Sequence, residues 1–94
     1  MLKISVVEGP RRCRLVVAGM LTEPWVGEFI GEYTTAKQQL NGRELVVDIT
    51  NLSAVGPAGE SALLLLLDDN AKFHAGVYMK EVLKQLACQR RRSK

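Results

Sequence analysis

An apolar run followed, after a loop, by a row of leucines constrains the fold of this chain more than any other feature. Residues 45–49 are nearly all apolar and are bounded by turn residues, which predicts a central strand buried on both faces and parallel to a neighbour. Gly56 and Pro57 then predict a helix start, because Gly suits the cap and Pro the first helical position. Residues 63–67 are five leucines, so this helix is expected to lie deep. A buried strand followed by a buried helix indicates an α/β domain.

The N-terminal residues predict two further strands. Residues 2–6 alternate apolar and polar side chains, which is the period of a half-buried strand. Residues 8–10 predict a turn, and a second strand is expected over residues 12–20, antiparallel to the first because the link is short. Three arginines lie around the start of the second strand: Arg11, Arg12 and Arg14. They are interpreted as charges that keep a sheet edge from pairing rather than as a basic binding patch.

A helix is expected between these strands and residues 45–49. Thr22, Glu23 and Pro24 resemble a helix start, with a hydroxyl cap, an acid and an early proline. Apolar side chains then recur every three or four residues until Asn41-Gly42, which predicts one buried stripe: Trp25, Phe29, Tyr33, Ala36 and Leu40. The stripe is interpreted as core rather than as the wall of a ligand groove.

The C-terminal part predicts one more strand and helix. The leucine helix is expected to continue until Ala75-Gly76 breaks it. A short strand is expected at residues 77–79, then a brief amphipathic helix over residues 82–86. The predicted order is β-β-α-β-α-β-α, a mixed sheet of about four strands with about three helices. One domain is expected over residues 1–88, followed by a flexible basic tail at residues 89–94.

Charge and cysteine content limit which cellular compartment and which classes of partner are expected. The net charge is +3, but residues 90–94 carry four of the thirteen positive charges, so nucleic-acid binding is expected at most from the tail and ranks last. Cys13 and Cys88 are too few and too far apart for a metal cage, and no secretion signal precedes them. The longest apolar run has six residues, against about twenty for a bilayer. A cytoplasmic protein is expected.

The residue types needed for catalysis are almost absent. His74 is the one histidine, placed by this reading at the end of the leucine helix. Ser61 and Asp68 would share that helix with it, so the three could not converge as a hydrolase triad. No metal ligand set is visible. The sequence therefore predicts neither an enzyme nor a cofactor.

Residues 56–59 form a Gly-x-x-Gly segment at a predicted helix start. No Lys-Ser or Lys-Thr follows it, as a phosphate-binding P-loop requires. Free N–H groups at a helix N-terminus suit an anion, so a nucleotide or small-molecule sensor remains the alternative function.

Two segments resemble the STAS domain, the fold of anti-sigma factor antagonists. Residues 15–21, Leu-Val-Val-Ala-Gly-Met-Leu, resemble its opening strand and "G-x-L". Residues 48–59 match its "D-l-s-x-v-x-x-i-D-S-S-G" segment without a gap. The resemblance covers about residues 1–77, and it implies a protein that binds an anti-sigma factor or kinase.

The resemblance also implies a phosphorylation site that this chain lacks. In the family, the Ser or Thr before the final Gly is phosphorylated, and the added charge controls binding. Ala58 occupies that position, and Gly56 and Pro57 replace the preceding Asp and Ser. Neither Ser53 nor Ser61 matches the acceptor position. The prediction is binding without this switch.

The family's partner-binding face maps onto two loops of this sequence. The predicted contact residues, for a protein or for the alternative ligand, are Met20, Leu21, Thr22, Glu23, Ser53, Gly56, Pro57, Ala58, Gly59 and Glu60. STAS domains usually continue further beyond the piece that matches Val77. The shorter C-terminus predicts an apolar patch near Tyr78 and Met79, which a second copy could cover as a homodimer.

Overall fold

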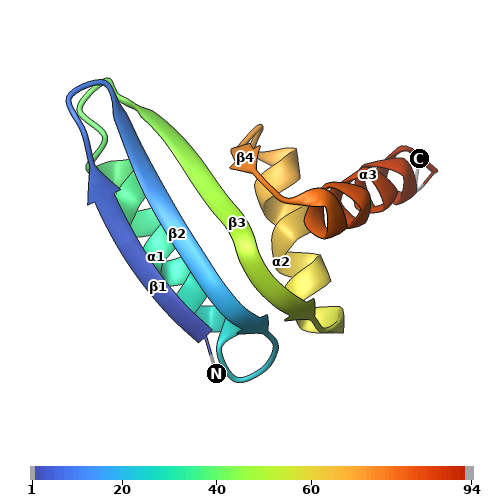
Figure 1. Ribbon diagram of the computed structural model, residues 1–94. Coiled ribbons are helices and arrows are strands. Elements are labelled where there is room, and N and C mark those ends of the chain that lie inside the picture. The colour runs from blue at the N-terminus through green and yellow to red at the C-terminus, as the bar shows by residue number, and fades with distance from the viewer. Residues whose placement is uncertain (1, 93–94) are drawn as a thin grey trace.

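The computed structural model describes residues 2–92 and has the predicted element order (Figure 1). The elements are β1 (Leu2–Glu8), β2 (Arg12–Leu21), α1 (Val26–Gln38), β3 (Glu44–Val55), α2 (Pro57–Asp68), β4 (Lys72–His74) and α3 (Val77–Arg92). Four strands and three helices make an α/β fold, as the sequence predicts.

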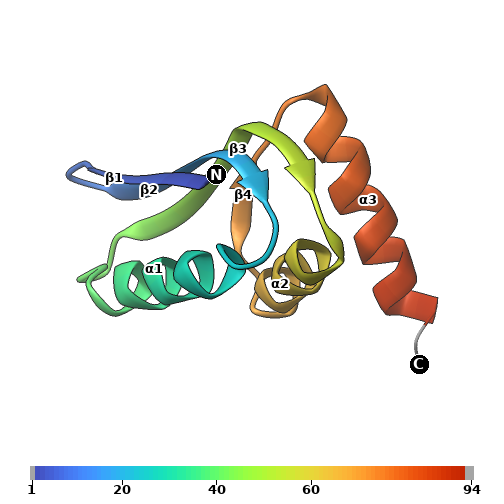
Figure 2. The same ribbon diagram turned by 90° about the horizontal axis from the view of Figure 1, so that it is seen from below.

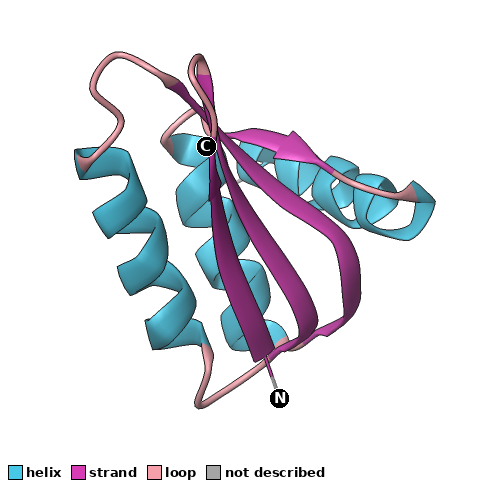
Figure 3. Cartoon of the chain, turned by 60° about the vertical axis from the view of Figure 1, so that its left-hand side comes forward, coloured by secondary structure: helices cyan, strands magenta, loops and turns pink. Residues whose placement is uncertain are grey.

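The four strands form one mixed sheet in the order β1-β2-β3-β4 (Figure 3). β1 and β2 are the antiparallel hairpin that was predicted, while β2–β3 and β3–β4 are parallel. Both crossovers step in the same direction along the sheet. Right-handed crossovers of that kind put their helices on one face, and α1 and α2 do lie on the same face (Figure 2).

The opposite face of the sheet is not covered by α1 or α2. The prediction that β3 is buried on both faces is therefore wrong: Val47 and Ile49 are fully buried, but Val46 and Asp48 are only half-buried. The core lies between the sheet and the two helices. Its fully buried members include Leu15, Val17, Val47, Ile49, Phe29 and Leu63, each contributing roughly 1.5–3 kcal/mol by burial.

The helix α1 buries three of the five residues of the predicted stripe, Phe29, Tyr33 and Ala36, and begins later than predicted. Trp25 and Leu40 lie just outside the helix and are half-buried. Thr22 does not cap the helix. Its carbonyl instead accepts a 2.8 Å hydrogen bond from the Trp25 N–H, closing a turn before the first helical residue.

The leucine helix α2 has a buried side and an exposed side. Leu63 and Leu66 are buried, whereas Leu65 is 59% exposed. The expectation of a helix buried all round is wrong, because α2 lies in the outer layer of a two-layer structure (Figure 2). It ends at Asp68, and the chain turns back into the sheet.

The last strand lies five residues earlier than predicted. β4 pairs its three residues with β3, and Phe73 is opposite Val47. His74 is therefore on a strand and not at the end of the leucine helix. Gly76 then leads the chain past Thr50, and residues 77–79, predicted as a strand, begin α3.

The helix α3 packs beside α2 (Figure 2). Met79 and Leu86 on it are buried, so Met79 is not part of an exposed apolar patch; Val77 and Tyr78 are exposed. The backbone helix continues through residues 89–92 of the predicted tail, and residues 93–94 lie outside the described part. No helix among the described residues is long and apolar enough to cross a membrane.

The edges of the sheet are β1 and β4, not β2. β2 lies between β1 and β3, so the interpretation of Arg11, Arg12 and Arg14 as guards of a sheet edge is wrong. Arg14 instead lies 4.0 Å from the Asp48 carboxylate on the neighbouring strand.

Candidate functional site

The two loops predicted to form the contact surface lie side by side at one end of the sheet. β2 and β3 are parallel, so their carboxyl ends meet at the same edge. Met20 is opposite Ala54, and Leu21 is opposite Val55. The Gly56 N–H donates a 3.0 Å hydrogen bond to the Leu21 carbonyl, which joins the start of α2 to the end of β2.

Eight of the ten predicted contact residues reach the surface there. Thr22, Gly56 and Ala58 are half-buried, and the exposed residues define what we call the loop surface: Met20, Glu23, Ser53, Pro57 and Glu60. Leu21 and Gly59 are buried. The prediction that these two residues contact a partner directly is therefore wrong: they support the surface from below.

Gly59 is required by packing. A Cβ built on it would lie 2.2 Å from the Leu21 carbonyl oxygen and 2.9 Å from Val55 Cγ1. Only a residue without a side chain lets the first turn of α2 press so closely on the end of β2. The second glycine of the Gly-x-x-Gly segment thus serves the fold, whatever the loop binds.

The N-terminus of α2 carries no side-chain cap. Gly56, in extended conformation, is the cap residue, and Pro57 is the first helical residue. The Glu60 N–H donates to the Gly56 carbonyl at 2.9 Å. Ala58 supplies no hydroxyl at the position that the family phosphorylates.

The two nearby serines are tied to the backbone. Ser53 Oγ donates to the Gly19 carbonyl at 3.0 Å, beside the register shift between Gly19 and Met20. Ser61 Oγ donates to the Pro57 carbonyl at 3.3 Å. Both hydroxyls stabilise local backbone geometry around the loop surface.

The loop surface combines apolar side chains with carboxylates. Met20 is 43% exposed, and Pro57 is exposed as well. Glu23 and Glu60 are exposed acids. None of the five residues is basic. The apolar side chains suit an apolar partner surface, and the carboxylates suit basic residues on it. The same carboxylates disfavour phosphate, since like charges repel.

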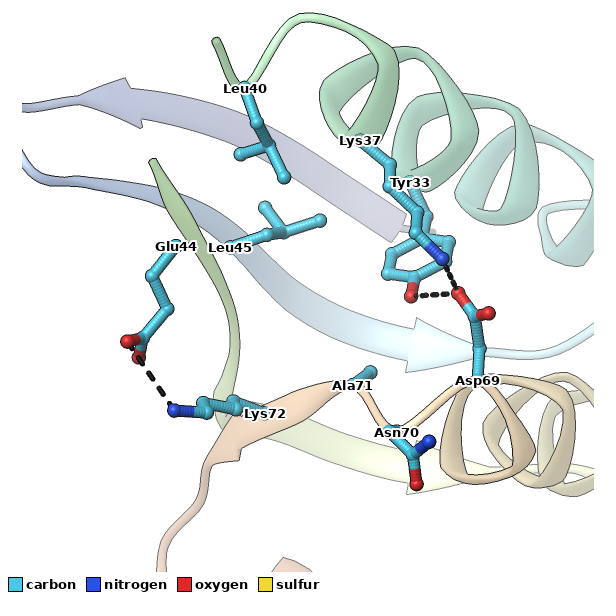
Figure 4. Close-up of a pocket in the computed structure, with 9 residues that line it drawn as sticks. All are labelled: Tyr33, Lys37, Leu40, Glu44, Leu45, Asp69, Asn70, Ala71 and Lys72. Atoms are coloured by element: carbon cyan, nitrogen blue, oxygen red, sulfur yellow. Dashed lines mark hydrogen bonds and ion pairs between the residues drawn. The ribbon is translucent and has the colours of Figure 1, made fainter. Parts of the chain in front are cut away.

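A pocket of about 200 Å³ lies at the other end of the helices (Figure 4). Tyr33 Oη donates a 2.8 Å hydrogen bond to the Asp69 carboxylate, and Lys37 pairs with the same oxygen. These two hydrogen bonds lower the pKa of Asp69. Burial, the hydrogen bond and the charge of Asp69 raise the pKa of Tyr33.

Across this pocket a second ion pair joins Lys72 Nζ to Glu44 at 3.3 Å, and the wall between the pairs is apolar, with Leu40, Leu45 and Ala71 (Figure 4). This cluster could not be predicted from the sequence because its residues come from α1, β3, β4 and the loops that follow α1 and α2. No sequence signal joins Tyr33 to Asp69, which are 36 residues apart.

A second missed group lies on the uncovered face of the sheet. Asp48 Oδ1 accepts a 3.0 Å hydrogen bond from the Thr50 N–H. Burial opposes ionisation of Asp48, but the Thr50 hydrogen bonds and the charges of His74 and Arg14 outweigh it and lower the pKa of Asp48. These residues lie on neighbouring strands, where they link the sheet.

The residues considered as a triad do not share one helix. Ser61 and Asp68 are on α2, but His74 is on β4, so the prediction that His74 shares their helix is wrong. Among the described residues, no group of three or more His, Cys, Asp or Glu side chains could hold a metal ion.

Comparison with solved structures identifies the fold class of this chain. The chain has the SpoIIAA-like fold, the fold of STAS domains, as the sequence resemblance implied. A crystal structure of an uncharacterized protein of the DUF3478 family from Shewanella loihica PV-4, described as having this fold, superposes with a TM-score of 0.56 at 12% identity. The match covers 90% of this chain and 93% of that one. No family profile and no curated protein sequence matches the chain.

Proposed function

We propose that this chain is a non-catalytic domain that regulates a protein of the anti-sigma factor or kinase type by binding it through the loop surface. The observation that carries the proposal is the convergence of the β2 and β3 carboxyl ends, where the Gly56 N–H bonds to the Leu21 carbonyl. The SpoIIAA-like fold is consistent with this role.

Binding in this proposal does not depend on phosphorylation at the usual position. Ala58 has no hydroxyl, and the Ser53 and Ser61 hydroxyls each donate to a backbone carbonyl. Association is then controlled by the concentrations of the two proteins, or by the partner's own state.

The test compares two charge-altered proteins in affinity capture from the source cell. Met20→Lys with Glu60→Lys changes the loop surface, whereas Leu65→Lys with Glu81→Lys makes the same chemical changes at exposed positions on α2 and α3. We expect an anti-sigma factor or kinase to be captured by the unaltered chain and by the control, and its recovery to fall at least tenfold with the loop-surface variant.

Equal recovery on both variants would exclude the loop surface as the contact. Failure to capture any such protein with the unaltered chain would exclude the partner class. Circular dichroism of each variant checks that the fold is retained.

The alternative is a nucleotide or small-molecule sensor, favoured by the uncapped N-terminus of α2. Thermal unfolding with a panel of nucleotides distinguishes the two functions, because a ligand that binds only the native state raises Tm. We expect no nucleotide to raise Tm, since Glu23 and Glu60 are exposed near this helix start.

A further inference from the structure

β1 is an edge strand that none of the described residues covers on its outer side. Its seven residues pair with β2 alone, without a register shift. It contains no proline, and Val6 and Val7 are 45% and 55% exposed. Natural sheets usually protect a long edge with proline, a bulge or several charges. The other edge, β4, has only three residues.

The turn that ends β1 reveals which backbone groups point outward. The Gly9 N–H donates to the Arg12 carbonyl at 2.9 Å, so these two residues form a hydrogen-bonded pair. Such pairs alternate along an antiparallel ladder. Lys3, Ser5 and Val7 therefore bond to β2, and the N–H and C=O groups of four residues point to the free edge: Leu2, Ile4, Val6 and Glu8.

Those outward groups are complementary to a second copy of the same strand. When two β1 strands run antiparallel with Ser5 opposite Ser5, Ile4 is opposite Val6 and Leu2 is opposite Glu8. Every outward residue then faces another outward residue and can exchange both hydrogen bonds. A register centred on Ile4 or Val6 leaves one outward residue of each strand unopposed.

The side chains fit the same register. On the helix-covered face, Val6 lines a gap of about 180 Å³ between β1 and α1, and Ile4 of the second copy would lie beside Val6. On the uncovered face, the Lys3 stem would lie against Val7, where its methylene groups cover apolar surface while the ammonium stays in water. Both contacts occur twice by symmetry.

We propose that two copies of this chain associate through β1, antiparallel and centred on Ser5, to form one continuous sheet. Pairing takes place at the outer edge of β1, away from the β2–β3 junction that forms the loop surface. The proposal is therefore independent of the proposed function.

Disulfide trapping tests the register. In a Cys88→Ser background, where Cys13 is buried, Ser5→Cys places two thiols directly opposite one another at a pair without hydrogen bonds, within reach of a disulfide. We expect it to form a covalent dimer under mild oxidation. Lys3→Cys and Val7→Cys should each form no covalent dimer alone and should cross-link to one another when mixed. Cross-linking of Lys3→Cys to itself, or none for Ser5→Cys, overturns the register.

Proline substitution tests the edge itself, measured by sedimentation equilibrium. Val6→Pro removes an N–H that points outward, so β1 remains paired with β2. Val7→Pro removes an N–H that bonds to β2 and should lower Tm. We expect the unaltered chain to sediment at twice its mass of 10.4 kDa. Val6→Pro should sediment at the single mass while remaining folded, and its Tm should fall less than that of Val7→Pro because only the contribution of the dimer is lost. A monomeric unaltered chain, or a dimer that persists in Val6→Pro, overturns the proposal.

Discussion

At the scale of single residues, Gly59 is constrained by the close approach of two backbone segments and not by chemical reactivity. Gly59 lies where α2 presses on the ends of β2 and β3, and a methyl group there would overlap the Leu21 carbonyl. Gly31 is also helical, on α1, but a Cβ on it would meet nothing within 4 Å. Gly31 therefore provides a matched control for a substitution at Gly59.

Gly59→Ala should destabilise the fold by about 1–3 kcal/mol, because the added carbon overpacks the junction. Gly31→Ala should stabilise it by roughly 1 kcal/mol, because alanine favours the helix. Urea unfolding followed by circular dichroism measures both. A Gly59→Ala protein as stable as the unaltered chain would contradict the packing role.

The Asp69 carboxyl makes stability depend on pH. Its pKa is lowered in the folded state, mainly by the hydrogen bonds from Lys37 and Tyr33. A carboxyl group whose pKa is lowered by folding stabilises the fold at pH values above its unfolded pKa of about 4. This stabilisation is lost as the pH falls through the folded pKa.

Asp69→Asn should therefore lower stability at pH 7 and flatten the loss of stability below pH 4. Chemical unfolding between pH 7 and pH 2.5 measures the slope, with Glu23→Gln at the other end of the molecule as the control. An unchanged slope in Asp69→Asn would mean that the Lys37–Tyr33–Asp69 cluster does not stabilise the fold.

At the scale of elements, α3 is firmly packed into the domain beside α2. Met79 and Leu86 are buried, while Val77 and Tyr78 on the same helix are exposed. The sequence predicts only a brief helix over residues 82–86. The helix is longer because the apolar positions from Met79 to Leu86 lie on one side of it and pack against the core beside α2.

Leu86→Ala should cost about 2–5 kcal/mol of unfolding free energy, as is typical of a leucine removed from a core. Tyr78→Ser should change it by less than about 0.5 kcal/mol, as at most surface positions. Denaturant unfolding of both variants provides the measurement. A small effect of Leu86→Ala would show that α3 is only loosely attached.

At the scale of the whole molecule, the arrangement separates three surfaces. The loop surface lies at the carboxyl ends of β2 and β3, the Tyr33–Asp69 pocket involves the C-terminal ends of α1 and α2, and the unpaired β1 forms one side. Because all crossovers step in one direction, α1 and α2 leave a whole face of the sheet uncovered (Figure 2).

The order of the elements and the position of the loop surface could be predicted from sequence alone. Alternation in residues 2–6 and the stripe through Phe29 and Tyr33 are local patterns with the period of a strand and a helix. They remain visible whatever the rest of the chain does. The contiguous match over residues 48–59 located the loop surface for the same reason.

Tertiary structure alone decided which strand became the edge, where β4 formed and which leucines were exposed. β4 has three residues, too few for a periodic signal, and its position depends on pairing with β3. Leu65 differs from Leu66 only in the direction it faces within the layers. Gly59 and the Tyr33–Asp69 hydrogen bond depend on segments far apart in the chain. Such contacts are set by packing in three dimensions, which no local pattern encodes.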